Sequence, residues 1–259
     1  MRKLIVAATA FALFSTANAF AEKIRIGVTP GPHAQIMEKV KEVAATKGME
    51  IDIQEFSDYV IPNMALADKA LEANSFQHQP YLDNQVADRG FPIETVAPTV
   101  NFPMGLYSSK LKNITELADG ATIAIPNDPT NGGRALLVLA DNGLIKLDAS
   151  KGLKVTTIDV TENPKNLKFV ELDAAQLPRS LEDVDAAVIN TNYALEAGLD
   201  PAGGALIREG EKAPYVNVLV VRTEDKDADW VKTLVSSYHN PEVKQFIADT
   251  FKGSVIPAW

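Results

Sequence analysis

The sequence of 259 residues contains no cysteine and three histidines, His33, His78 and His239. Without cysteine the chain has no disulfide, no thiolate metal site and no cysteine nucleophile. The histidines are scattered through the chain and lack the paired spacing of a zinc site. We therefore expect no metal and no cofactor.

Positive charge is also scarce. The chain has 25 Lys and Arg residues against 34 Asp and Glu residues, which gives a formal net charge of −9. No stretch gathers Lys and Arg into a cluster. A chain this acidic is a poor partner for nucleic acid or for an anionic membrane surface, so we expect neither.

Long apolar runs are absent outside the N-terminus. There, Arg2-Lys3 precedes an apolar stretch over residues 4–14, and "STANAFA" then offers Ala-x-Ala cuts after Ala19 or Ala21. The run is too short to span a bilayer and has the pattern of a secretory signal peptide. We expect residues 1–21 to be a signal peptide, with an uncleaved anchor as the alternative.

The usual catalytic motifs are missing too. The sequence contains no G-x-S-x-G, no H-E-x-x-H, no P-loop and no G-x-G-x-x-G. Acidic residues are many, but they are distributed as on solvated helix faces. The sequence therefore gives no support for a catalytic carboxylate pair and does not exclude one. We expect no catalytic residue and a protein that is not an enzyme.

What the chain does contain is two successive sets of strands and helices. Strand patterns in "KIRIGV" and "MEIDIQEF" alternate with helical spacing after each of them. The alternation restarts after the proline-punctuated stretch "APTVNFPMGLYS", with strands in "ATIAIP", "LKFVEL" and "DAAVIN" and a helix in "NGGRALLVLADNGL". This order predicts an α/β fold with largely parallel sheets.

The domain organisation follows from the end of the chain. Helical segments near Trp230–Tyr238 and Glu242–Phe251 have no sheet of their own, so we expect them to pack on the first set. We therefore predict one domain from residues 22–102 plus 219–259 and another from residues 103–218. Two crossings, in "PTVNFPMG" and "YVNVLVVR", would form a hinge, and ligands bind at the carboxyl ends of such strands.

A carboxylate site is predicted in "AIPNDPTNGGRALLVL". Free N–H groups at a helix start favour an anion, Gly132 and Gly133 allow close approach to the backbone, and Arg134 adds a planar fork that matches a carboxylate. The alternative for Arg134 is a surface residue on a first helical turn. Asn190 and Asn217 end or interrupt apolar strands, where a buried amide needs a partner. Asn217 fits a bond to neighbouring backbone as well as it fits a ligand contact.

Aromatic residues are few, at 7% of the chain, yet they gather with polar residues in "FQHQPYLDN", which includes His78 and Tyr81. Tyr59 and Phe102 are further candidates for an aromatic wall. Rings at one end and an arginine at the other would suit a small apolar amino acid with a free carboxylate. A sulfur atom against ring edges would add about 0.3–1.5 kcal/mol.

Taken together, "FQHQPYLDN", "AIPNDPTNGGRALLVL", "TENPKNLKFVELDAAQLPRSL", "AVINTNYA" and "PYVNVLVVR" resemble the methionine-binding members of the NlpA lipoprotein family. The likeness runs over nearly the whole chain after the signal peptide. It implies a two-lobed periplasmic-binding-protein fold, type II-like, that closes over L-methionine and delivers it to the membrane permease of a methionine ABC importer. Another amino acid, D-methionine or a methionine-containing dipeptide is the alternative ligand.

On the matching motifs, the resemblance implies that Arg134 holds the ligand carboxylate. Asn190 and Asn217 would hold its amino and carboxylate groups, and Tyr59, His78 and Tyr81 would surround the thioether. One departure stands out, because family members carry a lipobox cysteine and this chain has no cysteine. From that absence we expect a protein that is freely soluble in the periplasm, without a lipid anchor. We also expect a monomer.

Overall fold

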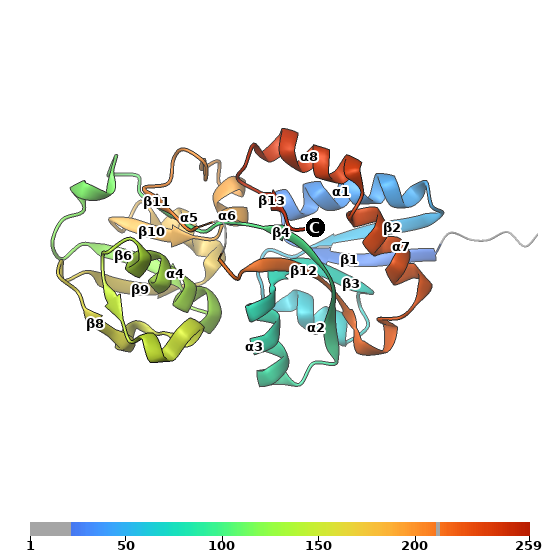
Figure 1. The fold of residues 1–259 in the computed structure, drawn as a ribbon, viewed down its shortest axis with the longest axis horizontal. Helices are drawn as coiled ribbons and strands as arrows, with labels where there is room; N and C mark the ends of the chain where they lie inside the picture. Colours follow the sequence, from blue (N-terminus) through green and yellow to red (C-terminus); the bar gives the residue numbers. More distant parts are fainter. Residues whose placement is uncertain (1–21, 211–212) are drawn as a thin grey trace, which may run out of the picture.

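Two β-sheets, each covered by helices on both faces, divide the protein into two lobes (Figure 1). The computed structural model describes residues 22–210 and 213–259. The signal peptide expected over residues 1–21 lies outside the described residues. We call the six-stranded sheet with its helices the first lobe, and the five-stranded sheet with its helices the second lobe.

The sheet of the first lobe has the order β13-β4-β12-β3-β1-β2. Strands β1, β2 and β3 are parallel, whereas β12 runs antiparallel to both β3 and β4. Its strands are β1 (Glu22–Val28), β2 (Met49–Glu55), β3 (Ala73–His78), β4 (Ile93–Asn101), β12 (Val216–Arg222) and β13 (Ile256–Pro257).

The sheet of the second lobe has the order β11-β5-β10-β6-β9, in which β6 is parallel to both neighbours. A separate two-stranded ribbon joins β7 (Lys146–Leu147) to β8 (Val160–Glu162). The five strands are β5 (Gly105–Tyr107), β6 (Thr122–Pro126), β9 (Lys168–Leu172), β10 (Ala186–Ile189) and β11 (Ile207–Arg208).

Helices form the outer layers because each presents an apolar stripe to its sheet. On the first lobe, α1 (Pro32–Ala45), α7 (Asp229–Tyr238) and α8 (Pro241–Phe251) share one core, so the C-terminal helices lie where the sequence analysis placed them. The other face carries α2 (Ile61–Ala67) and α3 (Gln79–Arg89). On the second lobe, α4 (Pro129–Asp141) covers one face, and α5 (Leu177–Ser180) and α6 (Thr191–Glu196) cover the other.

Strand β4 occupies part of the stretch that the sequence suggested only as a crossing. Pro98 lies within β4 and cannot donate to a ladder, which hides the strand from pattern analysis. The register between β12 and β4 shifts around the pair Val218↔Pro98, so this proline sits at an irregularity of the ladder. Proline is tolerated in a sheet at such irregularities.

Both crossings between the lobes leave the first sheet at the same point. Strand β4 ends at Asn101, which pairs with Val216 at the start of β12. Residues 102–104 lead outward to β5, and the return segment follows β11. The boundaries at 102 and 218 stay a prediction, and β12 already pairs in the first sheet from Val216.

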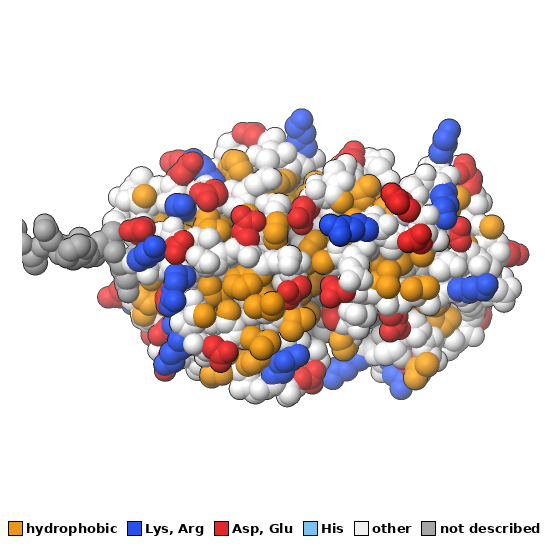
Figure 2. Space-filling view, turned by 180° about the vertical axis from the view of Figure 1, so that it is seen from behind, with side chains coloured by type: hydrophobic (Ala, Val, Ile, Leu, Met, Phe, Trp, Pro, Cys, Tyr) orange, Lys and Arg blue, Asp and Glu red, His pale blue; other side chains and the backbone are white. Residues whose placement is uncertain are grey.

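The outer surface is mixed in charge. Seen from behind, Lys and Arg are interspersed with Asp and Glu over both lobes, and hydrophobic side chains gather near the middle (Figure 2). Within the described part of the chain, no helix has the length and apolar character needed to cross a membrane.

Candidate functional site

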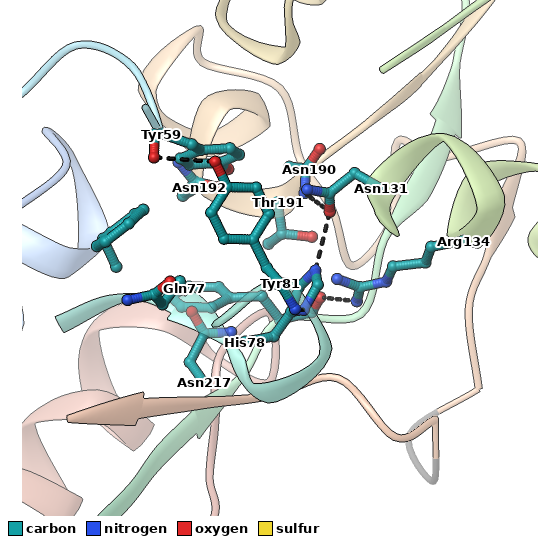
Figure 3. Close-up of a pocket in the computed structure, with 12 residues that line it drawn as sticks. Tyr59, Gln77, His78, Tyr81, Asn131, Arg134, Asn190, Thr191, Asn192 and Asn217 are labelled. Carbon is teal, nitrogen blue, oxygen red and sulfur yellow. Dashed lines mark hydrogen bonds between the residues drawn. The ribbon is translucent and has the colours of Figure 1, made fainter. Parts of the chain in front are cut away.

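A small cavity lies between the lobes, at the ends of strands from both sheets. Figure 3 shows side chains from both lobes pointing toward one another across it. The lining residues are Tyr59, Phe76, Gln77, His78, Tyr81, Phe102, Asn131, Arg134, Asn190, Thr191, Asn192 and Asn217.

The first lobe supplies its residues from strand ends. Strand β3 stops at His78, whose extended backbone makes it the N-cap of α3 and whose Nδ1 accepts a hydrogen bond from the Tyr81 amide at 3.1 Å. The antiparallel register places Asn217 of β12 directly opposite His78. Sheet register therefore brings together two residues that are far apart in sequence.

The second lobe supplies its residues from helix starts. Asp128 caps α4 by accepting a bond from the Asn131 amide at 2.9 Å, and its other oxygen accepts from Asn131 Nδ2 at 2.9 Å. Asn131 then faces the cavity from the first turn of α4 and Arg134 from the second. Asn190 is the N-cap residue of α6, and Thr191 and Asn192 open that helix.

Arg134 is 2% exposed and is paired with Glu209, which is 6% exposed. Its Nε donates to Glu209 Oε1 at 2.9 Å and its Nη2 to Glu209 Oε2, and Nη2 also donates to the Phe102 carbonyl at 2.8 Å. The guanidinium lies 4.3 Å from the centre of the Tyr215 ring, within the range of a cation–π contact. The pair is neutral overall, and the bonds of Arg134 to described residues come from Nε and Nη2.

A shared amide oxygen joins the lobes at the centre of the site. Asn131 Oδ1 accepts from Asn190 Nδ2 at 2.8 Å and lies 3.0 Å from His78 Nε2 (Figure 3). Since His78 Nδ1 already accepts from a backbone amide, the proton of the neutral ring sits on Nε2 and is donated to Asn131. Burial, and next the charge of Arg134, lower the pKa of His78 to about 3. This imidazole is therefore a fixed neutral donor.

A second buried histidine lies behind Asn217. His33 Nε2 is 3.2 Å from Asn217 Oδ1, and its Nδ1 is 2.8 Å from Thr29 Oγ1. The His33 ring also packs on Phe102, with centroids 4.7 Å apart. Burial lowers the pKa of His33 to about 4. The neutral ring can donate to Asn217 Oδ1, and this contact orients the Asn217 amide.

The far side of the cavity is aromatic. Tyr59 packs against Phe76, Tyr81 and Tyr193, with centroids 5.9, 6.0 and 5.0 Å apart. Tyr81 Oη donates to the Tyr59 carbonyl at 3.0 Å, and Tyr193 Oη donates to the Ser57 carbonyl at 3.1 Å. Burial raises the pKa of Tyr59 and of Tyr81, so both hydroxyls stay protonated.

Two buried amide atoms of the cavity have no hydrogen-bond partner among the described residues. They are the oxygen Oδ1 of Asn190 and the nitrogen Nδ2 of Asn192. Buried polar atoms are normally paired, and leaving one unpaired costs about 1–3 kcal/mol. The cavity therefore has one unused acceptor and one unused donor for a ligand.

All seven residues singled out from the sequence line this cavity: Tyr59, His78, Tyr81, Phe102, Arg134, Asn190 and Asn217. Arg134 is buried and ion-paired, and Asn217 bonds to His33 as well as weakly to the Tyr215 carbonyl at 3.5 Å. Their roles in binding remain predictions.

Sequence reasoning missed five lining residues and two supporting carboxylates. Asn131, Thr191 and Asn192 stand inside the quoted motifs "NGGR" and "INTNYA", so the signal was present and only the choice of residue was incomplete. Phe76 and Gln77 belong to the quoted stretch "FQHQPYLDN", of which only His78 and Tyr81 were named as site residues. Asp128 stands directly before Pro129, which is the pattern of a helix N-cap followed by proline at the first helical position, so a signal was present there. Glu209 carried no signal, because it lies in a polar loop that resembles a solvated turn.

The structure assigns the start of α4 a different role from the one expected. A Cβ on Gly132 would lie 2.8 Å from the Pro126 carbonyl oxygen, and one on Gly133 would lie 2.8 Å from that of Leu153. These glycines therefore let the helix pack closely on neighbouring backbone. The helix start is capped by Asp128, so the free N–H groups expected for an anion are partly satisfied from within the chain.

Comparison with known proteins places the chain in a family. Residues 24–259 match the model of the family described as NlpA lipoprotein. The chain is 47% identical to the D-methionine-binding lipoprotein MetQ of Escherichia coli strain K12, over 91% of this chain and 88% of that one.

Solved structures agree closely in fold. A nutrient-binding protein from Burkholderia cenocepacia bound to methionine has a TM-score of 0.89 at 50% identity, covering 91% of this chain and all (100%) of that one. An ABC transporter periplasmic substrate-binding protein from Coxiella burnetii has a TM-score of 0.88 at 49% identity, with 91% and 100% covered. The α/β two-lobed fold predicted from the sequence is that of periplasmic substrate-binding proteins.

One expectation is wrong. The sequence analysis predicted a freely soluble periplasmic protein without a lipid anchor, because the chain has no cysteine. The matched family is a lipoprotein family and the Escherichia coli relative is named a lipoprotein. These findings contradict the prediction of a protein without a lipid anchor, which rested on the lack of one residue type alone.

Proposed function

The chain belongs to the NlpA lipoprotein family, and we propose that it is the substrate-binding component of an ABC importer that captures methionine between its lobes. The Escherichia coli relative is named for D-methionine and the Burkholderia cenocepacia structure holds methionine. The observation that carries the proposal is one cavity between the lobes that joins a buried guanidinium to a group of packed rings.

The polar end of the cavity suits a zwitterion. Arg134 and Glu209 neutralise each other, so a ligand that is itself neutral overall brings no net charge into the buried site. Arg134 Nη1 and Asn217 Nδ2 are the donors assigned to the ligand carboxylate. No Asp or Glu is among the described residues that line the cavity and could pair with the ligand ammonium. We assign this role to the unpartnered Oδ1 of Asn190, which can accept a hydrogen bond from the ammonium.

The aromatic end suits a thioether. Tyr59, Phe76 and Tyr81 form an apolar surface, and sulfur makes favourable contacts with ring edges. Burying an apolar side chain of this size stabilises the complex by about 1.5–3 kcal/mol. We assign Tyr59, Tyr81 and His78 to the thioether side and Phe102 to the wall beside His33.

A binding role is favoured over an enzymatic one by the state of the histidines. A general base needs a free lone pair, and His78 uses Nδ1 as an acceptor and Nε2 as a donor within the protein. His33 is bonded through both nitrogens as well. We therefore propose a binding protein without catalytic residues.

Transport follows from closure. Bonds from the ligand to both lobes stabilise the closed state, and a membrane permease can distinguish the closed state from the open one. We propose that the protein acts as a monomer that delivers methionine to such a permease.

The test is calorimetric titration of the mature protein after unfolding and refolding to remove bound ligand. The panel is L-methionine, D-methionine, norleucine, glutamine and glycyl-methionine. Saturable 1:1 binding of L-methionine, tighter than that of glutamine, is the expected result. Binding of D-methionine or glycyl-methionine in its place would keep the carboxylate site and change the ligand, and no binding by any of the five would overturn the proposal.

A further inference from the structure

The amide of Asn192 lies on the aromatic side of the cavity. Asn192 is 3% exposed, lies on the first turn of α6 and lines the cavity. In Figure 3, Asn192 and Tyr59 lie together on one side of the site, and Arg134 lies on the opposite side. Asn192 is therefore placed beside the rings and away from the guanidinium.

Tyr59 fixes the orientation of this amide. Tyr59 Oη donates to Asn192 Oδ1 at 2.6 Å, and the Tyr59 ring is held between Tyr81 and Tyr193. Because the Tyr59 hydroxyl donates its proton to Asn192 Oδ1, the NH₂ group of the Asn192 amide stays free to donate to another partner. The bond crosses between lobes, since Tyr59 precedes α2 and Asn192 opens α6.

The amide nitrogen Nδ2 of Asn192 is buried and has no partner in the part of the chain that the structure describes. The hydroxyl of Tyr59 engages the other end of this amide and therefore gives Nδ2 no acceptor. An unpaired buried donor disfavours an apolar ligand at this place and favours one with an acceptor atom.

We propose that Asn192 is a specificity-determining residue, whose Nδ2 donates a hydrogen bond to an acceptor atom in the side chain of the bound amino acid. The inference rests on the proposed function and deepens it. A thioether sulfur is a weak acceptor, a sulfoxide oxygen is a stronger one, and the methylene of norleucine is none. The site therefore selects methionine over its hydrocarbon analogue and also admits methionine sulfoxide.

The experiment compares L-methionine, L-norleucine and L-methionine sulfoxide by calorimetry on four ligand-stripped proteins: wild type, Asn192→Leu, Tyr59→Phe and Tyr193→Phe. Asn192→Leu removes the amide at similar size, and Tyr59→Phe removes only the hydroxyl that orients it. Tyr193→Phe is the matched control, because it removes a hydroxyl from the neighbouring ring that bonds to Ser57 instead.

Wild type should prefer methionine to norleucine about tenfold, the size of one net hydrogen bond. In Asn192→Leu this ratio should fall several-fold, to the preference that sulfur–ring contacts alone provide, with the sulfoxide losing more affinity than methionine. Tyr59→Phe should reduce the ratio partway, and Tyr193→Phe should leave it unchanged.

An equal loss for all three ligands in Asn192→Leu would overturn the inference, since that result would place Asn192 on the shared carboxylate or ammonium. If Asn192→Leu fails to fold, an unchanged ratio in Tyr59→Phe overturns it instead. Failure of the proposed function looks different, because wild type would then bind none of the three.

Discussion

The two lobes reach the cavity with different parts of their structure. The first lobe uses the ends of β3 and β12 and the residues around them, which bring Phe76, His78 and Asn217. The second lobe uses the N-terminal turns of α4 and α6, which bring Arg134 and Asn192 among others. Strand ends in the first lobe are set by sheet register, whereas the start of α4 in the second lobe is fixed by the Asp128 cap.

This difference also divides the chemistry. Most rings of the cavity come from the first lobe, whereas its guanidinium and most of its amides come from the second. Neither lobe alone offers both the group of rings and the guanidinium. A ligand with an apolar side chain and a zwitterionic head must contact both lobes, and this requirement couples binding to closure.

The largest effect is expected from breaking the second lobe's contribution at Arg134. Arg134→Ala should weaken methionine binding about 100- to 1,000-fold, because it removes a buried charged partner. It should also lower the free energy of unfolding by about 3–5 kcal/mol, since Glu209 is left buried and unpaired. Titration and thermal unfolding measure the two effects.

Arg134→Lys separates these effects. Lysine retains a charge for Glu209 but loses the planar fork, so stability should largely return while binding stays weak. Affinity close to that of wild type in both variants would contradict the carboxylate role.

The second-largest expected effect is a loss of folding stability at acidic pH. Both buried histidines belong to the first lobe, and burial lowers their pKa values, to about 4 for His33 and about 3 for His78. The unfolded chain takes up protons near pH 6.5 while the folded chain does not, so stability is full above pH 6.5. It falls as the pH drops toward 4, by on the order of 3 kcal/mol for each ring.

Urea unfolding of wild type and His33→Gln between pH 7 and pH 4 tests this. The variant should lose less stability over that range, because it lacks one of the two rings. His239→Gln is the matched control, since His239 makes an exposed contact with the Pro98 carbonyl. Equal pH dependence in wild type and His33→Gln would contradict the buried neutral state.

Asn217→Ala tests the single amide that β12 contributes. It should weaken methionine binding about 10- to 30-fold and also lower the melting temperature, because His33 Nε2 loses its partner. A lower melting temperature with unchanged affinity would assign Asn217 to structure alone.

The smallest effect is expected from Tyr81→Phe. Losing the hydroxyl that donates to the Tyr59 carbonyl should lower the free energy of unfolding by about 1 kcal/mol and change affinity only a few-fold. Tyr107→Phe in the second lobe should have the opposite effect on stability, because the Tyr107 hydroxyl is buried without a partner among residues 22–210 and 213–259. Tyr107→Phe should leave the melting temperature unchanged or raise it, whereas Tyr81→Phe should lower it, and thermal unfolding of both variants measures this difference.

Much of this arrangement was accessible from the sequence, for identifiable reasons. Arg134, Asn190 and Asn217 are polar residues at the ends of apolar patterns, where burial demands a partner, and all three line the cavity. The two-lobed fold followed from two successive sets of strands and helices. Such local patterns can be recognised in the sequence without information on tertiary contacts.

What the sequence concealed depends on tertiary contacts. Glu209 lies in a glycine-flanked polar loop, and nothing local indicates that it folds back onto Arg134, 75 residues earlier in the chain. Strand β4 was hidden by Pro98, which only the ladder irregularity accommodates. The pairing of Tyr59 with Asn192 joins residues 133 positions apart.

The central claim, that methionine is held by both lobes at once, is tested most directly by small-angle X-ray scattering of the ligand-stripped protein with and without saturating L-methionine. A fall in the radius of gyration on binding is the predicted result, because the ligand bridges an open molecule into the closed form. Calorimetrically confirmed binding without any change in the radius of gyration would contradict closure between the lobes.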